Sequence, residues 1–297
     1  MPVPAATTYT LIDGKKIAGE IKLEILQRVA ERKAAGKKIP HLAIILVGDD
    51  GASQTYVDHK VRACKDVGFH YTMMRFADTI SEEKLMKHID QVNKDEDVDG
   101  FIVQLPLPPH IGVERITEKI RADKDVDGFT NQNFGSIVSK HPLLMPATPF
   151  GVMELIRRYH IPTEGRHAVM VGASRLVGAP LSMMLAEQAR ATVTICHKYT
   201  QNLAAYTRQA DILLVGVGKP GLITADMVKE GAVVIDIGTT RVEDATKKSG
   251  FSLRGDVDFD AVAPKTSFIT PVPGGVGPMT ISSLLLNTLR ATEHRHP

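Results

Sequence analysis

Short apolar runs alternate with segments of helical periodicity along most of the chain, and this alternation limits the possible folds. In the first half, the runs 41–48, 69–76 and 100–105 predict buried strands, while 53–67 and 81–93 space their apolar residues as helices do. Strands separated by single helices form parallel sheets that carry helices on both faces. The first half is therefore predicted to be a three-layer α/β domain.

The alternation stops once and then starts again. Residues 141–151, HPLLMPATPFG, carry three prolines and a glycine, which favours an extended linker. A helix is predicted over 177–190, and further strands over 167–172, 191–196, 211–218 and 232–238. We expect one α/β domain over 1–147 and a second over 148–278. A last helix within 279–297 is expected to pack back on the first domain.

The bulk properties narrow the class of function. A chain of 297 residues can form two domains, each with its own core. The net charge of +2 gives no electrostatic case for nucleic acid or a membrane as the main partner. The start, MPVPAATTYT, lacks the basic residues and apolar core of the usual signal or transit peptide. We expect a cytoplasmic protein, and a mitochondrial location stays open.

The cysteines and histidines indicate neither a disulfide nor a metal site. Cys64 and Cys196 are the only cysteines and lie far apart in sequence, which fits a reducing compartment and two buried thiols. The His, Met and Cys residues show no ligand spacing, so no metal site is predicted.

A glycine-containing turn opens the first strand–helix unit of the second half. In VMVGASRLVGAP (169–180), Gly172 ends a strand and Gly178 lies in the following turn. Glycine lets a pyrophosphate approach a helix N-terminus, whose free N–H groups attract anions. The spacing differs from the usual dinucleotide fingerprint, so an ordinary strand–helix turn is the alternative.

The end of the next strand bears on the choice of nucleotide. It reads Cys196-His197-Lys198, with no acidic residue nearby. An acid at this place usually binds the ribose hydroxyls of NAD, whereas a base suits the 2′-phosphate of NADP. The pattern favours NADP, and the alternative is a solvated His–Lys pair.

A tyrosine and a lysine lie four residues apart in YVDHK (56–60). On a helix, Tyr56 and Lys60 share one face, one turn from each other. From the spacing alone, a solvated surface is the commoner explanation of such a pair.

Six stretches in order along the chain resemble bifunctional methylenetetrahydrofolate dehydrogenase/cyclohydrolase. They are LIDGKKIAGEI (11–21), YVDHK (56–60), VQLPLPPH (103–110), DKDVDGF (123–129), GASRLVGAP (172–180) and ITPVPGGVGPMT (269–280). The resemblance implies an N-terminal folate domain, a Rossmann NAD(P)-binding domain, and a folate cleft between them. It also implies a homodimer that oxidises 5,10-methylenetetrahydrofolate with NADP. The same site then hydrolyses the methenyl product to 10-formyltetrahydrofolate.

The resemblance also assigns roles to residues. It implies that Lys60 moves protons during methenyl hydrolysis, with its pKa lowered by desolvation toward the working pH. Tyr56 is expected to offer its ring to the folate and its hydroxyl to the lysine, while Gln104 holds Lys60 and the attacking water. Asp127 is expected to bind the pterin through two parallel hydrogen bonds. The remaining substrate candidates are Leu105, Pro271 and Gly275. The implied NADP-binding residues are Thr148, Gly172, Ala173, Ser174, Arg175, His197, Lys198, Thr239 and Thr280.

Two details limit the match, and three alternatives stay open. Asp99 lies in the similar phrase DVDG, but it precedes a strand and does not match the folate motif. Ala173 stands where several relatives carry an arginine that can bind the 2′-phosphate, which leaves Arg175 and Lys198 as candidates and weakens the expected preference for NADP. The alternatives are a monofunctional cyclohydrolase, an NAD-preferring dehydrogenase of the same family, and a non-catalytic NADP-sensing regulator. The joint presence of the hydration residues argues against the regulator.

Overall fold

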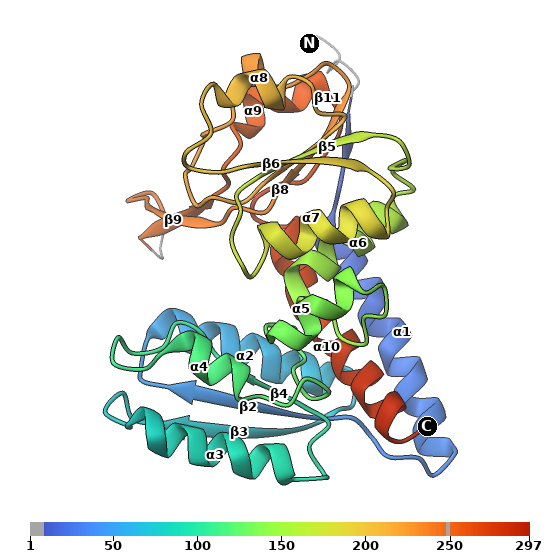
Figure 1. Ribbon diagram of the computed structural model, residues 1–297, viewed down its shortest axis with the longest axis vertical. Helices are drawn as coiled ribbons and strands as arrows, with labels where there is room; N and C mark the ends of the chain where they lie inside the picture. Colours follow the sequence, from blue (N-terminus) through green and yellow to red (C-terminus); the bar gives the residue numbers. More distant parts are fainter. Residues whose placement is uncertain (1–8, 248–249) are drawn as a thin grey trace. The chain divides into compact units, whose positions relative to one another are not determined.

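The computed structural model describes residues 9–247 and 250–297, which form two compact units (Figure 1). The first unit contains Ala18–Ala147 and Ile281–Pro297, and the second contains the residues up to Ile17 and Thr148–Thr280. Each unit is built on a parallel sheet flanked by helices. The predicted α/β fold class is confirmed.

The first unit has a three-stranded parallel sheet in the order β3 (His70–Phe76), β2 (His41–Val47) and β4 (Gly100–Val103). The helices α2 (Gly51–Asp66) and α3 (Glu82–Lys94) lie on opposite faces of this sheet (Figure 1). The apolar side chains of α3 pack against alternate residues of β2, namely Ala43, Ile45 and Val47. The other residues of β2 therefore face the opposite side of the sheet.

Side-chain caps fix where these helices begin. The carboxylate of Asp50 accepts a hydrogen bond from the backbone N–H of Ser53 (2.8 Å), which starts α2. The hydroxyl of Ser81 accepts one from the N–H of Lys84 (3.3 Å), which starts α3.

Two long helices that the strand pattern did not define complete the first unit. α1 (Gly14–Ala34) buries Ile21, Ile25 and Val29, which recur every four residues along one face. α10 (Val276–Arg295) joins the first unit from Ile281 onward. The side-chain amide of its Asn287 donates to the carbonyls of Val126 (2.8 Å) and Met145 (2.7 Å), so the last helix packs back on the first domain as predicted.

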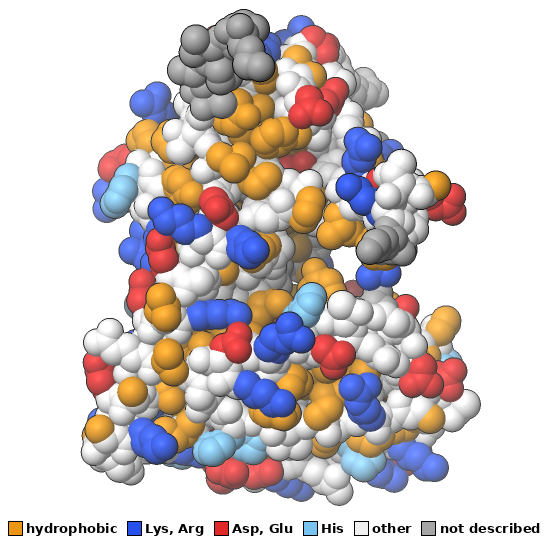
Figure 2. Space-filling model, turned by 180° about the vertical axis from the view of Figure 1, so that it is seen from behind, with side chains coloured by type: hydrophobic (Ala, Val, Ile, Leu, Met, Phe, Trp, Pro, Cys, Tyr) orange, Lys and Arg blue, Asp and Glu red, His pale blue; other side chains and the backbone are white. Residues whose placement is uncertain are grey.

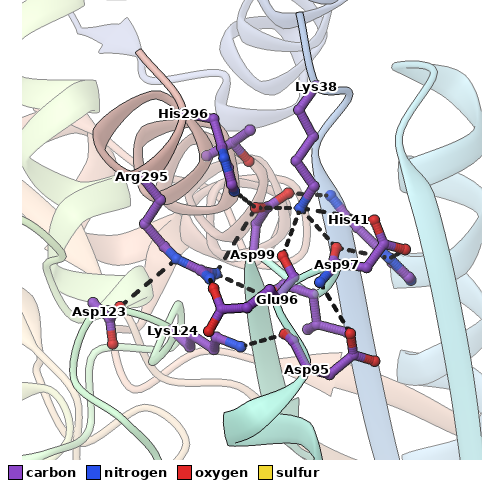
Figure 3. Close-up of polar contacts among 12 residues, drawn as sticks. Lys38, His41, Asp95, Glu96, Asp97, Asp99, Asp123, Lys124, Arg295 and His296 are labelled. Carbon is purple, nitrogen blue, oxygen red and sulfur yellow. Dashed lines mark hydrogen bonds and ion pairs between the residues drawn. The ribbon is translucent and has the colours of Figure 1, made fainter.

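A buried polar network holds the end of α10 in the first unit (Figure 3). Asp99 is fully buried and accepts hydrogen bonds from Nζ of Lys38 (2.7 Å) and the backbone N–H of His41 (3.0 Å). Arg295 donates to the carbonyl of Val98 (2.8 Å), and His296 faces the Asp99 carboxylate. These partners give Asp99 a structural role.

The second unit has a six-stranded sheet in which all neighbouring strands are parallel. The strand order is β1 (Thr10–Leu11), β11 (Thr266–Ile269), β8 (Ala232–Asp236), β7 (Ile212–Val215), β5 (His167–Val171) and β6 (Thr192–Cys196). The next strand in the chain, β6, lies on one side of β5, and the strand after it, β7, lies on the other side of β5. The strand order thus reverses at β5, and ligands of such sheets bind at the carboxyl ends of the strands beside this point.

Shorter elements fill in the rest of the described chain. The helices are α4 (Val113–Glu118), α5 (Asn131–Val138), α6 (Ala147–Arg158), α7 (Gly178–Glu187), α8 (Leu203–Thr207) and α9 (Phe259–Val262). Two 3₁₀ turns span Ala225–Met227 and Ala263–Lys265. An antiparallel hairpin pairs β9 (Thr240–Glu243) with β10 (Phe251–Arg254).

Three expectations need correction. The expected first domain, 1–147, includes β1, but β1 pairs with β11 in the second unit. Two residues are too few to show a strand pattern in the sequence. The stretch 141–151 is not all linker, since α6 begins in it at Ala147; Pro149 lies in the first turn, where a missing N–H costs nothing. The last helix was expected from residue 279, but α10 already begins at Val276.

The surface and the thiols have no unusual feature in the described part of the chain. On the face seen in Figure 2, basic and acidic side chains are interspersed. Cys64 and Cys196 are both free and buried, as expected. None of the described helices is both long and apolar enough to span a bilayer. Within the described ranges, no group of three His, Cys, Asp or Glu residues is placed to hold a metal ion.

Candidate active site

Lys60 is held inside the first unit although it is a lysine on a polar helix. Its neighbours Asp58 and His59 are exposed, yet Lys60 itself is only 6% exposed. Val57 and Cys64, which flank it on the inner face of α2, are fully buried. Nζ of Lys60 donates a hydrogen bond to Oε1 of Gln104 (3.0 Å). The packing of α2 therefore carries this amine to the carboxyl end of β4.

Gln104 is fixed by its place directly after β4. Its backbone N–H donates to the carbonyl of Ile45 (2.8 Å), which extends the sheet by one residue. Its side-chain amide donates to the carbonyl of Leu105 (2.6 Å), which precedes a cis peptide bond to Pro106. The amide nitrogen is thus engaged, and the amide oxygen is turned toward Lys60.

Asp127 stands in a turn that a second carboxylate holds in place. The buried Asp125 accepts hydrogen bonds from the N–H groups of Gly128 (3.0 Å) and Thr130 (2.8 Å). The backbone carbonyl of Asp127 accepts one from the N–H of Ala147 (3.1 Å). Asp125 is therefore a structural turn residue, and the half-buried side chain of Asp127 takes no part in these hydrogen bonds.

The two charges of this site act on each other. Burial lowers the pKa of Lys60, and the charge of Asp127 opposes that shift. Burial raises the pKa of Asp127, while the charge of Lys60 lowers it. An amine in this environment loses its proton more readily than a solvated lysine does.

Tyr56 lies in α2, one turn before Lys60 as predicted, but makes no hydrogen bond to it in the described structure. The residue is 45% exposed. In the part of the chain that the structure describes, Nζ of Lys60 has Gln104 as its hydrogen-bond partner. Among the described residues, the expected contact from the Tyr56 hydroxyl to Lys60 is therefore absent.

The turn after β5 uses its glycines for internal packing. Gly172 has φ +121°, and a Cβ there would lie 2.4 Å from the carbonyl oxygen of Gly216. A Cβ on Gly178 would lie 1.9 Å from the carbonyl oxygen of Gly172. The hydroxyl of Ser174 accepts hydrogen bonds from the N–H groups of Val177 and Gly178 (3.3 Å each), at the start of α7. Ala173, Ser174 and Arg175 are exposed.

The end of β6 emerges beside this turn. Val171 pairs with Cys196, and the N–H of Gly172 donates to the carbonyl of Cys196 (2.9 Å). His197 and Lys198 follow directly and are exposed. The ammonium of Lys198 lies 4.9 Å from the ring centre of the exposed Tyr199.

The remaining candidates of the second unit lie in loops and helix starts. The hydroxyls of Thr148 in α6 and Thr280 in α10 are 3.0 Å apart. Thr239 is exposed and follows β8, and Pro271 is half-buried. A Cβ on Gly14 would lie 1.8 Å from the carbonyl oxygen of Gly275, so the backbone of this loop packs directly against the start of α1.

The sequence reasoning missed two buried acids in the second unit. Asp236 is 3% exposed at the end of β8, and Asp256 is fully buried before α9. The available signal was an acidic residue closing the otherwise apolar strand AVVID.

Comparison with known proteins decides the family. The catalytic-domain model of the tetrahydrofolate dehydrogenase/cyclohydrolase family matches residues 12–127, and its NAD(P)-binding-domain model matches residues 146–296. The chain belongs to this family. The bifunctional protein FolD of Cytophaga hutchinsonii is 55% identical over 284 residues, which cover 95% of this chain and 98% of the relative.

Solved structures of relatives share the whole fold. The bifunctional FolD dehydrogenase/cyclohydrolase of Campylobacter jejuni is 45% identical with a TM-score of 0.92, covering 97% of this chain and 99% of its own. The Trypanosoma brucei enzyme, solved with NADP cofactor and an inhibitor, is 37% identical with a TM-score of 0.91 over 96% and 98% of the two chains. The predicted family and enzyme class, which pairs a methylenetetrahydrofolate dehydrogenase with a methenyltetrahydrofolate cyclohydrolase, are confirmed.

Proposed function

We propose that this chain oxidises 5,10-methylenetetrahydrofolate with NADP and hydrolyses the methenyl product to 10-formyltetrahydrofolate, with Lys60 as the residue that moves protons in the second step. The observation that carries this proposal is the buried lysine, bonded to Gln104 and influenced by the charge of Asp127. A buried amine with a lowered pKa is neutral more often than a solvated lysine, which suits it to accept a proton from water.

The hydration step follows from this arrangement. The neutral amine of Lys60 takes a proton from water as the water oxygen bonds to the methenyl carbon. The resulting ammonium then returns that proton to the ring nitrogen as the carbon–nitrogen bond breaks. The hydroxyl of the adduct loses its proton to solvent at the same time, so a formyl group remains on the other nitrogen. The Oε1 of Gln104 accepts from the amine and so orients it. The balance is one water consumed and one proton released.

The folate is proposed to bind through Asp127, since a carboxylate can accept two parallel hydrogen bonds from the pterin N–H and amine groups. The exposed ring of Tyr56 offers an apolar face to the same ligand. Leu105 adds a carbonyl that accepts one hydrogen bond from Gln104 and keeps a second lone pair for a donor of the ligand.

The dinucleotide is proposed to bind at the carboxyl ends of β5 and β6, and NADP is preferred over NAD. When bound, it supplies the hydride acceptor for the first reaction. Arg175, His197 and Lys198 are exposed beside the turn after β5. The end of β6 carries no acid, so the residues there would attract a 2′-phosphate. Ala173 contributes no charge to this group of basic residues.

An absorbance assay tests the function. Purified protein is supplied with methylenetetrahydrofolate and either NADP or NAD, and nucleotide reduction and methenyl decay are followed separately. Reduction of NADP followed by methenyl decay faster than in buffer supports both activities. Decay without reduction would identify a monofunctional cyclohydrolase. Faster reduction of NAD would overturn the nucleotide preference, and binding without turnover would point to a regulator.

We also propose that the protein is a cytoplasmic homodimer. Membership of a family with bacterial members such as the Cytophaga relative supports the location, and the family resemblance implies the dimer. Light scattering on the purified chain tests the oligomeric state, and a monomer mass at micromolar concentration would contradict it.

A further inference from the structure

We propose that Asp236 and Asp256 are positioning residues of the dinucleotide site, which hold the loops after β7 and β8 in the shape that receives the nucleotide. This inference rests on the proposed binding of the nucleotide by the second unit. Both acids are buried, with Asp236 3% and Asp256 0% exposed, and we assign their effect to the backbone that they hold.

Asp256 fixes the loop that follows β7. Its Oδ2 accepts hydrogen bonds from the backbone N–H groups of Val217 (2.6 Å) and Gly218 (2.9 Å). Both donors belong to the exposed segment that continues from β7 at the carboxyl edge of the sheet. A single carboxylate oxygen therefore sets the direction of two consecutive peptide groups in this loop.

Asp236 holds the partner segments from the end of β8. Its Oδ1 accepts from the N–H groups of Gly238 (2.9 Å) and Asp256 (3.1 Å), and its Oδ2 accepts from the N–H of Val257 (2.9 Å). Asp236 thus fixes the turn just before the exposed Thr239, one of the predicted nucleotide-binding residues. It also holds the backbone of Asp256, whose side chain in turn holds the loop after β7.

Glycines opposite the carboxylates make these contacts possible. A Cβ on Gly238 would lie 2.2 Å from Cγ of Asp256, and a Cβ on Gly255 would lie 2.0 Å from Oδ2 of Asp236. The loop after β7 in turn touches the turn after β5, because Gly172 packs against the carbonyl of Gly216. The acids therefore control three neighbouring loops at the edge where sheets of this kind bind dinucleotides.

The charge of the pair argues for a function beyond stability. Among the described residues, neither acid has a Lys or Arg partner, and Oδ1 of Asp256 has no hydrogen-bond partner. Burial, helped by the charge of Asp256, raises the pKa of Asp236 to about 6. A buried carboxylate with a raised pKa and no cation beside it disfavours the folded state when it is ionised. Such local conflicts are expected at functional sites and are rare elsewhere.

The test compares Asp256→Ala with Asp256→Asn, and uses the exposed Asp260 for the control Asp260→Asn. The affinity for NADP is measured by titration, and methenyl hydrolysis is measured without nucleotide. We expect Asp256→Ala to raise the Kd for NADP about tenfold, which corresponds to about 1.4 kcal/mol. Asp256→Asn should retain most of the affinity, because the amide oxygen can still accept from both N–H groups. Hydrolysis should be unchanged in all three variants, since Lys60 and Gln104 lie in the first unit.

An unchanged Kd in folded Asp256→Ala would overturn the inference, as would an equal loss of NADP binding and hydrolysis with a lowered unfolding temperature. If Asp256→Ala does not fold, Gly238→Ala decides, because its Cβ would displace the Asp256 carboxylate; a wild-type Kd there also overturns the inference. A wild type that binds neither nucleotide would refute the proposed function itself.

Discussion

The candidate residues of the two units differ in how firmly the protein holds them. In the first unit, Lys60 is buried and hydrogen-bonded to Gln104, whose own amide is fixed by Leu105. In the second unit, Arg175 and Lys198 are exposed at the edge of the sheet. A proton transfer needs an amine of altered basicity in a fixed position, whereas discrimination of a phosphate needs only a cation within reach.

This difference sets the size of the expected mutational effects. A buried group with bonded partners has no substitute when it is removed. An exposed cation interacts in a high-dielectric environment, where neighbouring cations and salt share its role. Large losses are therefore expected from the first unit and small ones from the exposed cations of the second.

The largest effect is expected for Lys60→Met. Methenyl hydrolysis should fall by about 10²–10⁴-fold, the usual contribution of a general acid–base group, while dehydrogenase activity survives at least in part. The matched control is Lys65→Met, an exposed lysine of the same helix. Hydrolysis at the wild-type rate in folded Lys60→Met protein would show that Lys60 takes no part in the mechanism. The expected difference in mutational effects between the two units would then be wrong.

Asp99→Ala tests whether a buried acid of the first unit that lies outside the candidate site affects stability but not turnover. Asp99 is fully buried and bonded to Lys38 and His41, but neither partner is a candidate site residue. Removing the carboxylate from a buried charge pair should lower the free energy of unfolding by about 3 kcal/mol. The turnover number of the folded fraction should stay near that of the wild type. Denaturant unfolding and steady-state kinetics measure the two quantities, and a large drop in turnover without loss of stability would contradict the structural role.

Asp127→Ala should weaken folate binding and lower both activities, because both reactions use the same pterin anchor. The loss of a charge-assisted hydrogen bond to a ligand costs about 1.5–3 kcal/mol. Titration of the folded variant with folate gives the affinity, and Asp99→Ala serves as the control from the similar phrase DVDG. Equal affinities of Asp127→Ala and wild type would show that the pterin binds elsewhere.

Most strands and several helices followed from the sequence because each is set by local pattern. The apolar runs at 41–48 and 232–238 became β2 and β8 with small changes at their ends. α6 was missed because prolines suggest a linker, although a helix tolerates proline in its first turn. β1 was missed because a two-residue strand is defined by its partner β11 and not by its own residues.

The site could be predicted only where a motif carries it. YVDHK and the QLPLP stretch pointed to Lys60 and Gln104, 44 residues apart, and the structure brings them to 3.0 Å. The pair Asp236 and Asp256 has no such motif, since a contact between residues 20 apart arises from tertiary packing alone. The exposed position of Tyr56 also depends on how α2 packs, which the helical spacing did not specify.

The smallest effect is expected for Lys198→Ala, which tests the exposed side of the comparison. The strand end carries no carboxylate, so Lys198 should attract a 2′-phosphate, and a single cation–phosphate contact at such a site is worth about 1–2 kcal/mol. The Michaelis constant for NADP should rise several-fold, with NAD nearly unaffected because it lacks that phosphate. The measurement is the ratio of kcat/KM for the two nucleotides in wild type, in Lys198→Ala, and in the control Lys247→Ala, another exposed lysine of the second unit. A wild type that favours NAD would overturn the preference itself. An undiminished NADP preference in Lys198→Ala would move the phosphate contact to Arg175 or His197, and the double variant Arg175→Ala/Lys198→Ala would then show whether the cations share one role, since their separate losses should not simply add.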